Sequence, residues 1–371
     1  MRLQALSLHT LHMPLVSAFT TSFGTQEART VLLVRALTDE SEGWGECVTI
    51  VDPVYTSEYT TGARQVIMDY LAPAVLAQPS IDVHDLRMRM AHVVGHQMAK
   101  SAVETAILDA YLKAIGMSLS VFLGGVRDRV ACGVSVGITP SIDDLLLQIR
   151  GYLDDGYRRI KLKIRPGWDV DPVRAVRDAF GTDLLLSVDA NTAYGPGTER
   201  ALLALDDFGL LMIEQPFPAD DIDAHVRLAK RIGTAICLDE SITSAKLAAS
   251  AIRQEACSIV NIKPGRVGGY LESRRIHDVC EAHGVPVWCG GMLETGIGRA
   301  ANVALAALPG FVLPNDTSAS ARYFSQDITD PFVLEDGYLR VPTRSGIGVD
   351  IHPEVLADYE VSSDLVSWDS R

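Results

Sequence analysis

The sequence predicts an α/β protein in which a large parallel barrel carries a smaller α+β domain. Eight short apolar runs after residue 130 alternate with helical segments, which is typical of a parallel sheet. Eight such units can close into a barrel. The length of 371 residues exceeds what one hydrophobic core usually supports, so we expect one large and one small domain.

The amino-terminal part of the chain predicts the smaller domain. Strand-like alternation extends to about residue 50 and ends in GWGEC (43–47), and residues 57–116 follow a helical pattern. Residues 18–30 are polar and contain Gly, so we expect a mobile loop there. Strands followed by helices are typical of an α+β domain. The turn-rich segment 124–130 marks the joint to the barrel.

From residue 131 onward, helical segments such as 143–157 and 270–284 separate the apolar runs. The runs expected to form strands are 131–138, 158–164, 184–188, 210–213, 235–238, 258–262, 285–289 and 311–313.

Composition argues against several partners. The chain has 33 basic and 47 acidic residues, a net charge of −14, whereas nucleic acids and anionic membranes require basic patches. No stretch approaches the roughly 18 to 20 apolar residues of a membrane span, and the amino terminus lacks a signal-like apolar region. The six cysteines show no metal spacing, and Cys132, Cys237, Cys257 and Cys289 lie in apolar runs, which favours buried, reduced thiols at these four positions. We therefore expect a cytoplasmic protein that binds a small molecule.

Polar residues at the predicted strand ends recur at a nearly constant interval. Lys163, Asp189, Glu214, Asp239 and Lys263 follow one another at steps of 26, 25, 25 and 24 residues. One β/α unit is about this long, so each residue falls at the carboxyl end of its strand. Barrel enzymes place their chemistry at that end.

The three acids of this series predict a metal site. Asp189, Glu214 and Asp239 each follow an apolar strand, and three carboxylates aimed at one point would repel each other without a cation. Oxygen ligands favour Mg²⁺, with Mn²⁺ or another divalent cation as the alternative. Any one acid alone could instead cap a helix or pair with a lysine. Three acids in register favour the metal.

The lysines predict acid–base chemistry. Lys161 and Lys163 lie two apart on one strand, so both point to one face, and each ammonium group disfavours the charge of the other. Lys263 ends the sixth strand, across the barrel. A metal-bound carboxylate between Lys163 and Lys263 could lose its α-proton to either lysine, and the metal would hold the enediolate. Alone, the Lys-x-Lys pattern would favour a solvated edge strand; its register with Lys263 reverses that interpretation.

Two other motifs suggest different chemistries. Residues 133–137 match GxSxG, but Val134 and Val136 suit a continuing strand better than a nucleophile turn. Residues 296–301 resemble a dinucleotide fingerprint, with Asp316 downstream, but they follow the seventh strand instead of opening a βαβ series. We reject both enzyme classes, although the helix amino terminus at 296 could bind a substrate carboxylate.

The motifs KLKI, VDANTAY, IEQP, CLDES and NIKPGRVGG, in this order, resemble the enolase superfamily in its muconate-lactonizing-like branch. Longer motifs resemble the N-acylamino acid racemase/o-succinylbenzoate synthase family, and the resemblance covers essentially the whole chain. These motifs are SFGTQ (22–26), GWGEC (43–47), GVSVGI (133–138), RIKLKIRPGWDV (159–170), CGGMLETGIGRAANVALAALPGF (289–311) and DTSAS (316–320).

The resemblance implies a modified TIM barrel, (β/α)₇β, over residues 126–325. The α+β capping domain would span 1–125 and be completed by the tail, about 326–371. It also implies Mg²⁺ on the three acids, an acid/base pair of Lys163 and Lys263 assisted by Lys161, and a homo-oligomer, commonly an octamer.

The same resemblance implies the substrate contacts. Ser135, Gly291 and Met292 would contact the acyl or carboxylate end, Asn191 would lie beside the metal, and Phe19, Phe23 and Tyr55 would close the pocket from the cap. Arg266 marks members able to racemize, and as a cation near Lys263 it should favour the neutral lysine. Leu293 stands where the family resemblance implies Ile, next to the acyl pocket.

The implied activity is racemization of N-acylamino acids, in particular N-succinylamino acids, with o-succinylbenzoate synthase activity as a companion. The alternatives are a physiological o-succinylbenzoate synthase of menaquinone biosynthesis, a dipeptide epimerase and a non-catalytic metal-binding barrel. The epimerase is disfavoured because the chain lacks its DxD motif at the eighth strand. Intact Lys163 and Lys263 disfavour the non-catalytic barrel.

Overall fold

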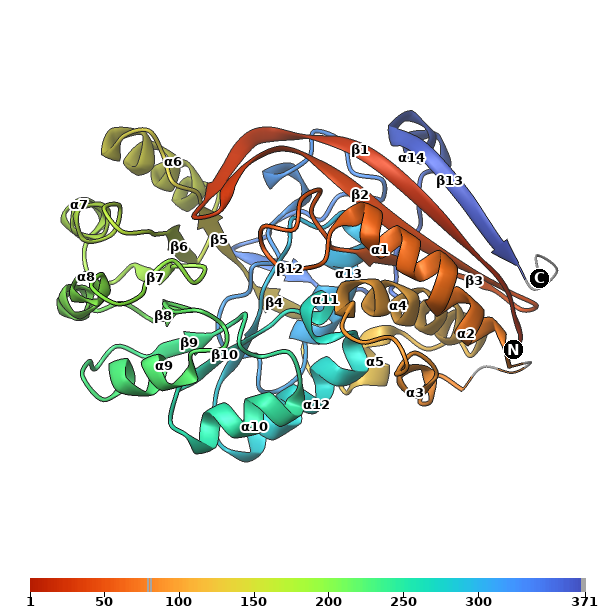
Figure 1. Ribbon diagram of the computed structural model, residues 1–371. Coiled ribbons are helices and arrows are strands. Elements are labelled where there is room, and N and C mark those ends of the chain that lie inside the picture. Colours follow the sequence, from red (N-terminus) through yellow and green to blue (C-terminus); the bar gives the residue numbers. More distant parts are fainter. Residues whose placement is uncertain (79, 81, 368–371) are drawn as a thin grey trace.

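The computed structural model describes residues 1–78, 80 and 82–367. An antiparallel sheet with its helices covers one end of a curled parallel sheet, whose other helices lie on the outside (Figure 1). The predicted combination of a barrel and an α+β cap is confirmed. Among the described residues, no helix is long and apolar enough to cross a membrane. All six cysteines are buried and free, which confirms the prediction made for Cys132, Cys237, Cys257 and Cys289.

The cap contains a four-stranded sheet in the order β13-β1-β2-β3. Its strands are β1 (Leu3–Thr21), β2 (Gly24–Thr38), β3 (Glu42–Cys47) and β13 (Glu360–Ser367). The helices beside it are α1 (Thr60–Val66), the π-helical turn η1 (Ile67–Leu71), α2 (Ala72–Leu76), α3 (Leu86–Arg89), α4 (Gln97–Ala114), α5 (Leu119–Leu123) and α14 (Pro353–Tyr359). The carboxyl-terminal strand β13 pairs with β1; the domain limits at 125 and 325 stay predictions.

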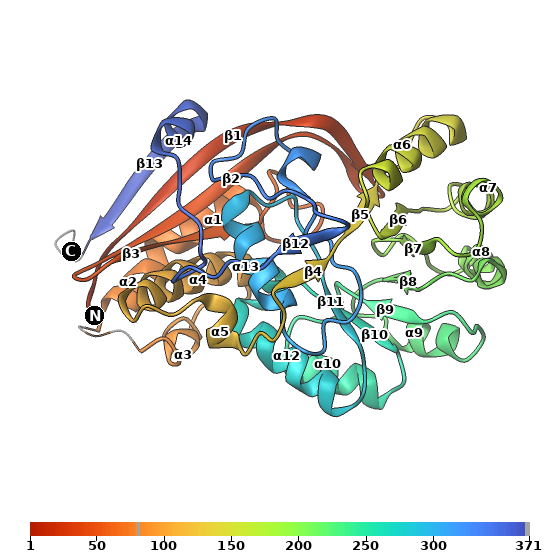
Figure 2. The same ribbon diagram turned by 180° about the vertical axis from the view of Figure 1, so that it is seen from behind.

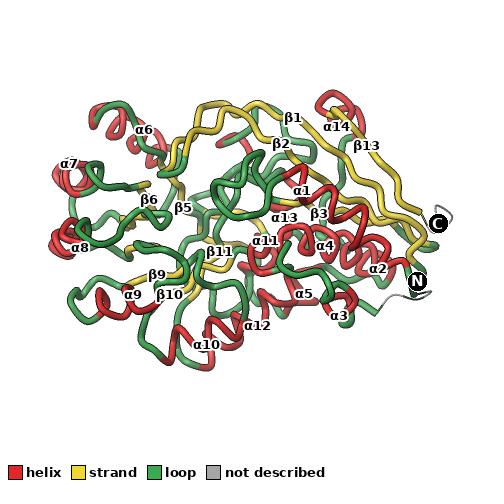
Figure 3. Tube along the Cα trace, in the orientation of Figure 1, coloured by secondary structure: helices red, strands yellow, loops and turns green. Residues whose placement is uncertain are grey.

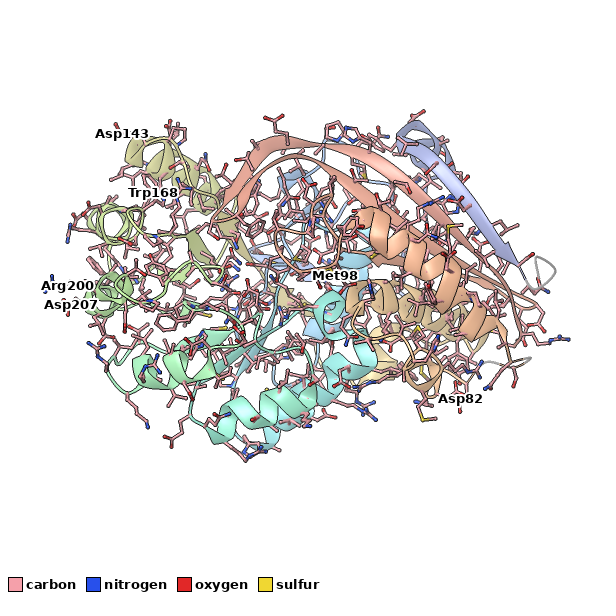
Figure 4. The ribbon with its side chains drawn as sticks, in the orientation of Figure 1. Asp82, Met98, Asp143, Trp168, Arg200 and Asp207 are labelled. Atoms are coloured by element: carbon pink, nitrogen blue, oxygen red, sulfur yellow. The ribbon has the colours of Figure 1, made fainter. Side chains whose placement is uncertain are left out.

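Close contact between β3 and α4 explains part of the GWGEC motif. A Cβ on Gly43 would lie 2.2 Å from the carbonyl oxygen of Ala106, and one on Gly45 would lie 2.2 Å from that of Ala102. Only glycine lets the strand and this buried helix approach so closely. Figure 4 labels Met98, near the start of α4 where the helix faces the barrel, and shows Arg200 and Asp207 at the remote rim.

The prediction of a mobile loop over residues 18–30 is wrong. Strands β1 and β2 continue through most of it, and Phe19, Thr20 and Thr21 pair with Gln26, Thr25 and Gly24. The polarity arises because this ribbon extends beyond the body of the cap, where solvent reaches its side chains, and threonine suits such a ribbon. The ribbon arches over the barrel to the region of β5 (Figures 1 and 2). We call residues 14–28 the β1–β2 arm.

The barrel sheet has seven parallel strands in the order β11-β10-β9-β8-β7-β6-β5. These are β5 (Gly133–Val136), β6 (Arg159–Lys163), β7 (Leu185–Asp189), β8 (Ile213–Glu214), β9 (Ile236–Leu238), β10 (Ile259–Ile262) and β11 (Val287–Cys289). Figure 3 shows the helices outside this sheet. They are α6 (Ile142–Asp154), α7 (Val170–Phe180), α8 (Glu199–Ala204) with the turn η2 (Leu205–Phe208), α9 (Ile222–Ala229), α10 (Ala245–Arg253) and α12 (Tyr270–Ala282). Two more helices contact the cap: α11 (Pro264–Val267) packs against α4, and α13 (Gly296–Ala306) packs against β3 and α5.

An extended segment closes the barrel where an eighth strand was predicted. Phe311 makes only an isolated bridge to Val287. The closing hydrogen bonds lie further on, because the N–H of Gly133 donates to the carbonyl of Asn315 (2.7 Å) and the N–H of Asp316 donates to that of Cys289 (2.9 Å). A short antiparallel sheet of β4 (Arg129–Ala131) and β12 (Tyr338–Arg340) lies beside it, and the turn η3 (Ser320–Arg322) follows the closing segment.

Candidate active site

Strand register brings the predicted polar series together. The Cα of Lys163 is paired with that of Asp189, and Asp189 is paired in turn with Glu214. Asp239 directly follows β9, and Lys263 directly follows β10. All five side chains are buried. The strand of Lys163, β6, is separated from β10, which Lys263 follows, by β7, β8 and β9.

Lys161 lies among three acids. Its Nζ is 3.0 Å from Glu214 Oε2, 3.3 Å from Asp189 Oδ2 and 2.7 Å from Asp316 Oδ2. The pKa of Lys161 is raised, because these three carboxylates outweigh the opposing effect of burial. Lys161 is therefore a fixed positive charge beneath the carboxylate cluster.

The other two lysines each contact one acid. Lys163 Nζ donates to Asp189 Oδ2 (2.6 Å) and Asn191 Oδ1 (2.7 Å). Lys263 Nζ donates to Asp239 Oδ2 (2.8 Å) and the Tyr55 hydroxyl (3.1 Å). The two lysines thus face the carboxylates from different sides of the barrel mouth.

Their surroundings shift the two lysines in opposite directions. Burial lowers the pKa of Lys163, and the ammonium groups of Lys161 and Lys263 lower it further, whereas the carboxylate of Asp189 acts in the opposite direction. Burial opposes the charge of Lys263 too, but Tyr55 and the nearby acids raise its pKa overall. Arg266 forms an ion pair with Asp239, the acid that Lys263 also contacts, so the expected effect of Arg266 on Lys263 stays a prediction.

Asp189, Glu214 and Asp239 form an all-oxygen donor set from adjacent strands, which fits a hard divalent cation. Burial raises the pKa of Glu214, and the negative charge of Asp189 adds to this rise, while the neighbouring lysines oppose it. For Asp189 the balance is reversed: burial would raise its pKa, but the neighbouring lysines outweigh burial and lower it. Lys161 contacts both acids, so the cluster is neutralised by ammonium groups.

A tighter group of ligand atoms occurs on α12 but does not suit a metal. One atom each from His277, Asp278 and Glu281 lies within 4.8 Å of the others. However, the His277 ring nitrogens are engaged, since Nδ1 lies 2.9 Å from Asp278 and Nε2 accepts from the N–H of Gly310 (3.0 Å).

The cap supplies three of the predicted contacts. The rings of Phe23 and Tyr55 are 5.6 Å apart, and the Tyr55 hydroxyl lies on Lys263. Ser22 Oγ donates to the carbonyl of Asn191 (3.4 Å). Phe19 is buried on the same arm, with the Arg322 guanidinium 5.8 Å from its ring. The arm therefore reaches the carboxyl ends of the barrel strands.

The predicted contacts from the barrel lie around the same mouth. Ser135 is paired with Lys161 across β5 and β6, and its buried hydroxyl has no hydrogen-bond partner among the described residues. A Cβ on Gly291 would lie 2.5 Å from the Asp316 carbonyl. Met292 packs against the hydrophobic core, and Leu293 is buried with a φ of 59°, a left-handed conformation strained for leucine.

The structure adds residues that were not predicted. Asp316 forms ion pairs with both Lys161 and Arg159, and Arg159 stacks on Trp288 at 4.5 Å. Asn261 donates to Glu214 Oε1 (2.6 Å). The alternation of Arg159, Lys161 and Lys163 could have revealed Arg159, because all three share one face of β6. Asp316 carried no comparable signal, since it follows the irregular closing segment.

The two rejected motifs have structural roles. Ser135 lies within β5, which confirms that GxSxG forms a strand here. Residues 296–301 begin α13, whose amino terminus already holds Glu46 of the cap through Thr295 and Gly298. The expectation that this helix end binds a substrate carboxylate is therefore wrong.

A capped barrel with three acids between two lysines at its mouth defines the enolase class of enzymes. A model of the mandelate racemase/muconate lactonizing enzyme N-terminal domain matches residues 5–124, and one described as enolase C-terminal domain-like matches residues 144–355. The chain belongs to this family of the enolase superfamily, as the sequence motifs predicted, and members of the superfamily use a divalent metal ion.

Two curated relatives and one solved structure are closely similar. The chain is 60% identical over 356 residues to an N-succinylamino acid racemase of Amycolatopsis sp., covering 96% of this chain and 97% of the relative. It is 46% identical over 354 residues to an o-succinylbenzoate synthase of Geobacillus kaustophilus, covering 95% and 94%. A Listeria innocua member of the enolase superfamily superimposes with a TM-score of 0.94 at 38% identity, covering 99% of both chains.

Proposed function

We propose that the protein racemizes N-acylamino acids, in particular N-succinylamino acids, by removing and replacing the α-proton. The placement of Lys163 and Lys263 on either side of three buried carboxylates carries this proposal. Racemization requires one group to remove the proton from one face and another to deliver a proton to the opposite face.

Asp189, Glu214 and Asp239 would hold Mg²⁺, since their donor set is oxygen only. Bound there, the ion supplies Lewis-acid stabilisation of the negative charge that develops on the substrate carboxylate. Lys161 adds a fixed positive charge next to two of these acids. Asn191 orients Lys163, because its Oδ1 accepts from that lysine while its Nδ2 donates to Glu240 (3.0 Å).

The two lysines begin the reaction in different roles. In each direction one lysine acts as the neutral amine that accepts a proton, and the other acts as the ammonium that donates one. The reverse reaction requires the opposite protonation of the pair. The cap assists by covering Lys263 with Tyr55 and Phe23, which keeps water away from the α-carbon.

Dehydration to o-succinylbenzoate is the second activity that we propose. It starts with the same proton removal, and the 46% identical synthase supports it. Lys163 alone would serve as base and acid on one face. The family resemblance supports a homo-oligomer, in particular an octamer, and the six free cysteines support action in the cytoplasm.

Deuterium exchange in D₂O tests the two-base proposal. N-succinyl-L- and N-succinyl-D-phenylalanine are followed by NMR with wild-type protein, Lys163→Ala and Lys263→Ala. Each variant should lose racemization, and each should exchange the α-proton of only one enantiomer. Lys246→Ala, on the exposed face of α10, is the matched control and should behave as wild type. A lysine variant that exchanges both enantiomers at near wild-type rates would contradict the two-base proposal.

A further inference from the structure

A cavity lies at the tip of the β1–β2 arm, outside the lysine–carboxylate cluster. Its volume is about 280 Å³, and its walls come from residues 23–30 and from the loop that follows β3. Phe23 lines it and packs on Tyr55, whose hydroxyl lies on Lys263. One aromatic pair therefore joins this cavity to the proposed reaction site.

Arg29 is the one cation among the residues that line this cavity. Its side chain is buried, with 1% of the residue exposed. The guanidinium makes one long hydrogen bond, from Nη1 to Gln26 Oε1 at 3.5 Å. Its Nε and Nη2 have no partner in the part of the chain that the structure describes. A buried cation without a paired anion is costly, so this side chain calls for an anionic ligand.

The nearest acids are occupied elsewhere. Glu46 and Glu294 lie within electrostatic reach of Arg29, but neither forms an ion pair with it among the described residues. The Glu46 carboxylate accepts from Thr295 Oγ1 (2.7 Å) and from the N–H groups at the start of α13. Glu294 Oε1 accepts from Asn302 Nδ2 (3.0 Å). These acids stabilise the charge of Arg29 from a distance, and its Nε and Nη2 stay without a hydrogen-bond partner among the described residues.

We propose that Arg29 binds a second carboxylate of the substrate, distinct from the one held beside the lysines. This inference rests on the proposed function, and it assigns part of the substrate specificity to the cap. A guanidinium can bind a carboxylate through two parallel N–H donors. Phe23, Ile50 and Val54 provide apolar walls for the carbon chain that carries it. Glu27 and Asp52 stand exposed at the rim, where water screens them.

The second carboxylate can come from either of two parts of an N-acylamino acid. A succinyl group carries one at the end of the acyl chain, and an acidic amino acid carries one on its side chain. N-succinyl-L-phenylalanine offers only the first, and N-acetyl-L-glutamate offers only the second. N-acetyl-L-phenylalanine offers neither and is the neutral reference.

Arg29→Met and Arg29→Lys are compared with wild type on all three substrates. Arg29→Met should raise KM about 10- to 100-fold for a substrate whose second carboxylate binds Arg29, the range expected for a lost charged hydrogen bond. The kcat/KM for N-acetyl-L-phenylalanine should change less than about twofold, and Arg29→Lys should recover part of the loss. Arg35→Met, on the same strand but partly exposed in an ion pair with Glu42, is the control.

Loss with N-succinyl-L-phenylalanine alone assigns the acyl end to Arg29, and loss with N-acetyl-L-glutamate alone assigns the side chain. Equal losses on all three substrates would overturn the inference and leave Arg29 a structural residue. Should Arg29→Met not fold, wild type provides the test. The second carboxylate of the substrate is then replaced by an amide, either at the end of the succinyl group or on the acidic side chain. One of these two replacements should raise the KM of wild type about tenfold. An unchanged KM for both replacements would overturn the inference. Absence of exchange from every N-acyl substrate in wild type would contradict the proposed function instead.

Discussion

Asp316 should be among the most important single side chains for stability. Its carboxylate is buried and forms ion pairs with Lys161 and Arg159, which are themselves buried. Two Arg159 nitrogens, Nε and Nη1, already have no hydrogen-bond partner among the described residues. The substitution Asp316→Asn preserves the shape and removes the charge, so one buried cation loses its counter-ion.

The cost follows from the burial of both partners. Removing one member of a buried ion pair typically costs about 3 to 5 kcal/mol, since it leaves an uncompensated charge in the interior. We expect Asp316→Asn to lower the free energy of unfolding by about that amount. Urea unfolding at pH 7, followed by far-ultraviolet circular dichroism and by tryptophan fluorescence, measures the change.

Glu42→Gln is the matched control, because it breaks a partly exposed pair with Arg35. Such a pair contributes about 0 to 1 kcal/mol, so the control should stay close to wild type. Unfolding of Asp316→Asn at the same urea concentration as this control would refute the stabilising role assigned to the Asp316 carboxylate. A variant that is stable but inactive would show that Asp316 acts in the reaction and that other residues compensate Arg159.

Two further predictions concern the cap. Burial raises the pKa of Glu46 to about 7 from its usual 4.5, so between these values the folded state keeps a proton that the unfolded state loses. Stability therefore falls as the pH rises from 4.5 to about 7. In Glu46→Gln, the urea midpoint should fall less between pH 5 and pH 7 than it does in wild type. An equal fall of the midpoint in both proteins would contradict this prediction. Gly43→Ala should destabilise by about 1 to 3 kcal/mol, because its Cβ would meet the backbone of Ala106 and Ala110 at 2.2 Å. At Gly151 on α6 an added Cβ meets nothing within 4 Å, so Gly151→Ala should stabilise the protein by about 0.5 to 1 kcal/mol. Equal thermal unfolding temperatures of the two glycine variants would contradict both expectations.

The barrel was predictable because its strands and its polar residues share one period. Buried parallel strands appear as short apolar runs, and steps of 24 to 26 residues from Lys163 to Lys263 reproduce the β/α unit. The β1–β2 arm was not predictable in the same way. Its pairing depends on two strands that leave the core together, so alternation with a buried face is weak from residue 14 to residue 28. The closing segment around Asn315 likewise depends on hydrogen bonds to β5 and β11, not on propensity.

The candidate site was predicted as a set of strand-end residues, and their partners were not. Spacing places Asp189 beside Glu214, but it does not show that Lys161 contacts both. It also does not show that Arg266 and Lys263 share Asp239 as an ion-pair partner. Side-chain direction at the barrel mouth depends on neighbours from four or more strands, and a single sequence contains no direct record of those neighbours.

Charge balance links stability to function in this cluster. The number of buried acidic side chains in it equals the number of buried basic ones: Asp189, Glu214, Asp239, Glu240 and Asp316 against Arg159, Lys161, Lys163, Lys263 and Arg266. Each buried charge requires a partner, so the groups proposed to hold the metal and move the proton also neutralise one another. Any substitution here disturbs both properties. Loss of turnover therefore identifies a catalytic group only when the folded fraction is unchanged, and exchange from a single enantiomer provides that distinction, because an unfolded protein exchanges neither.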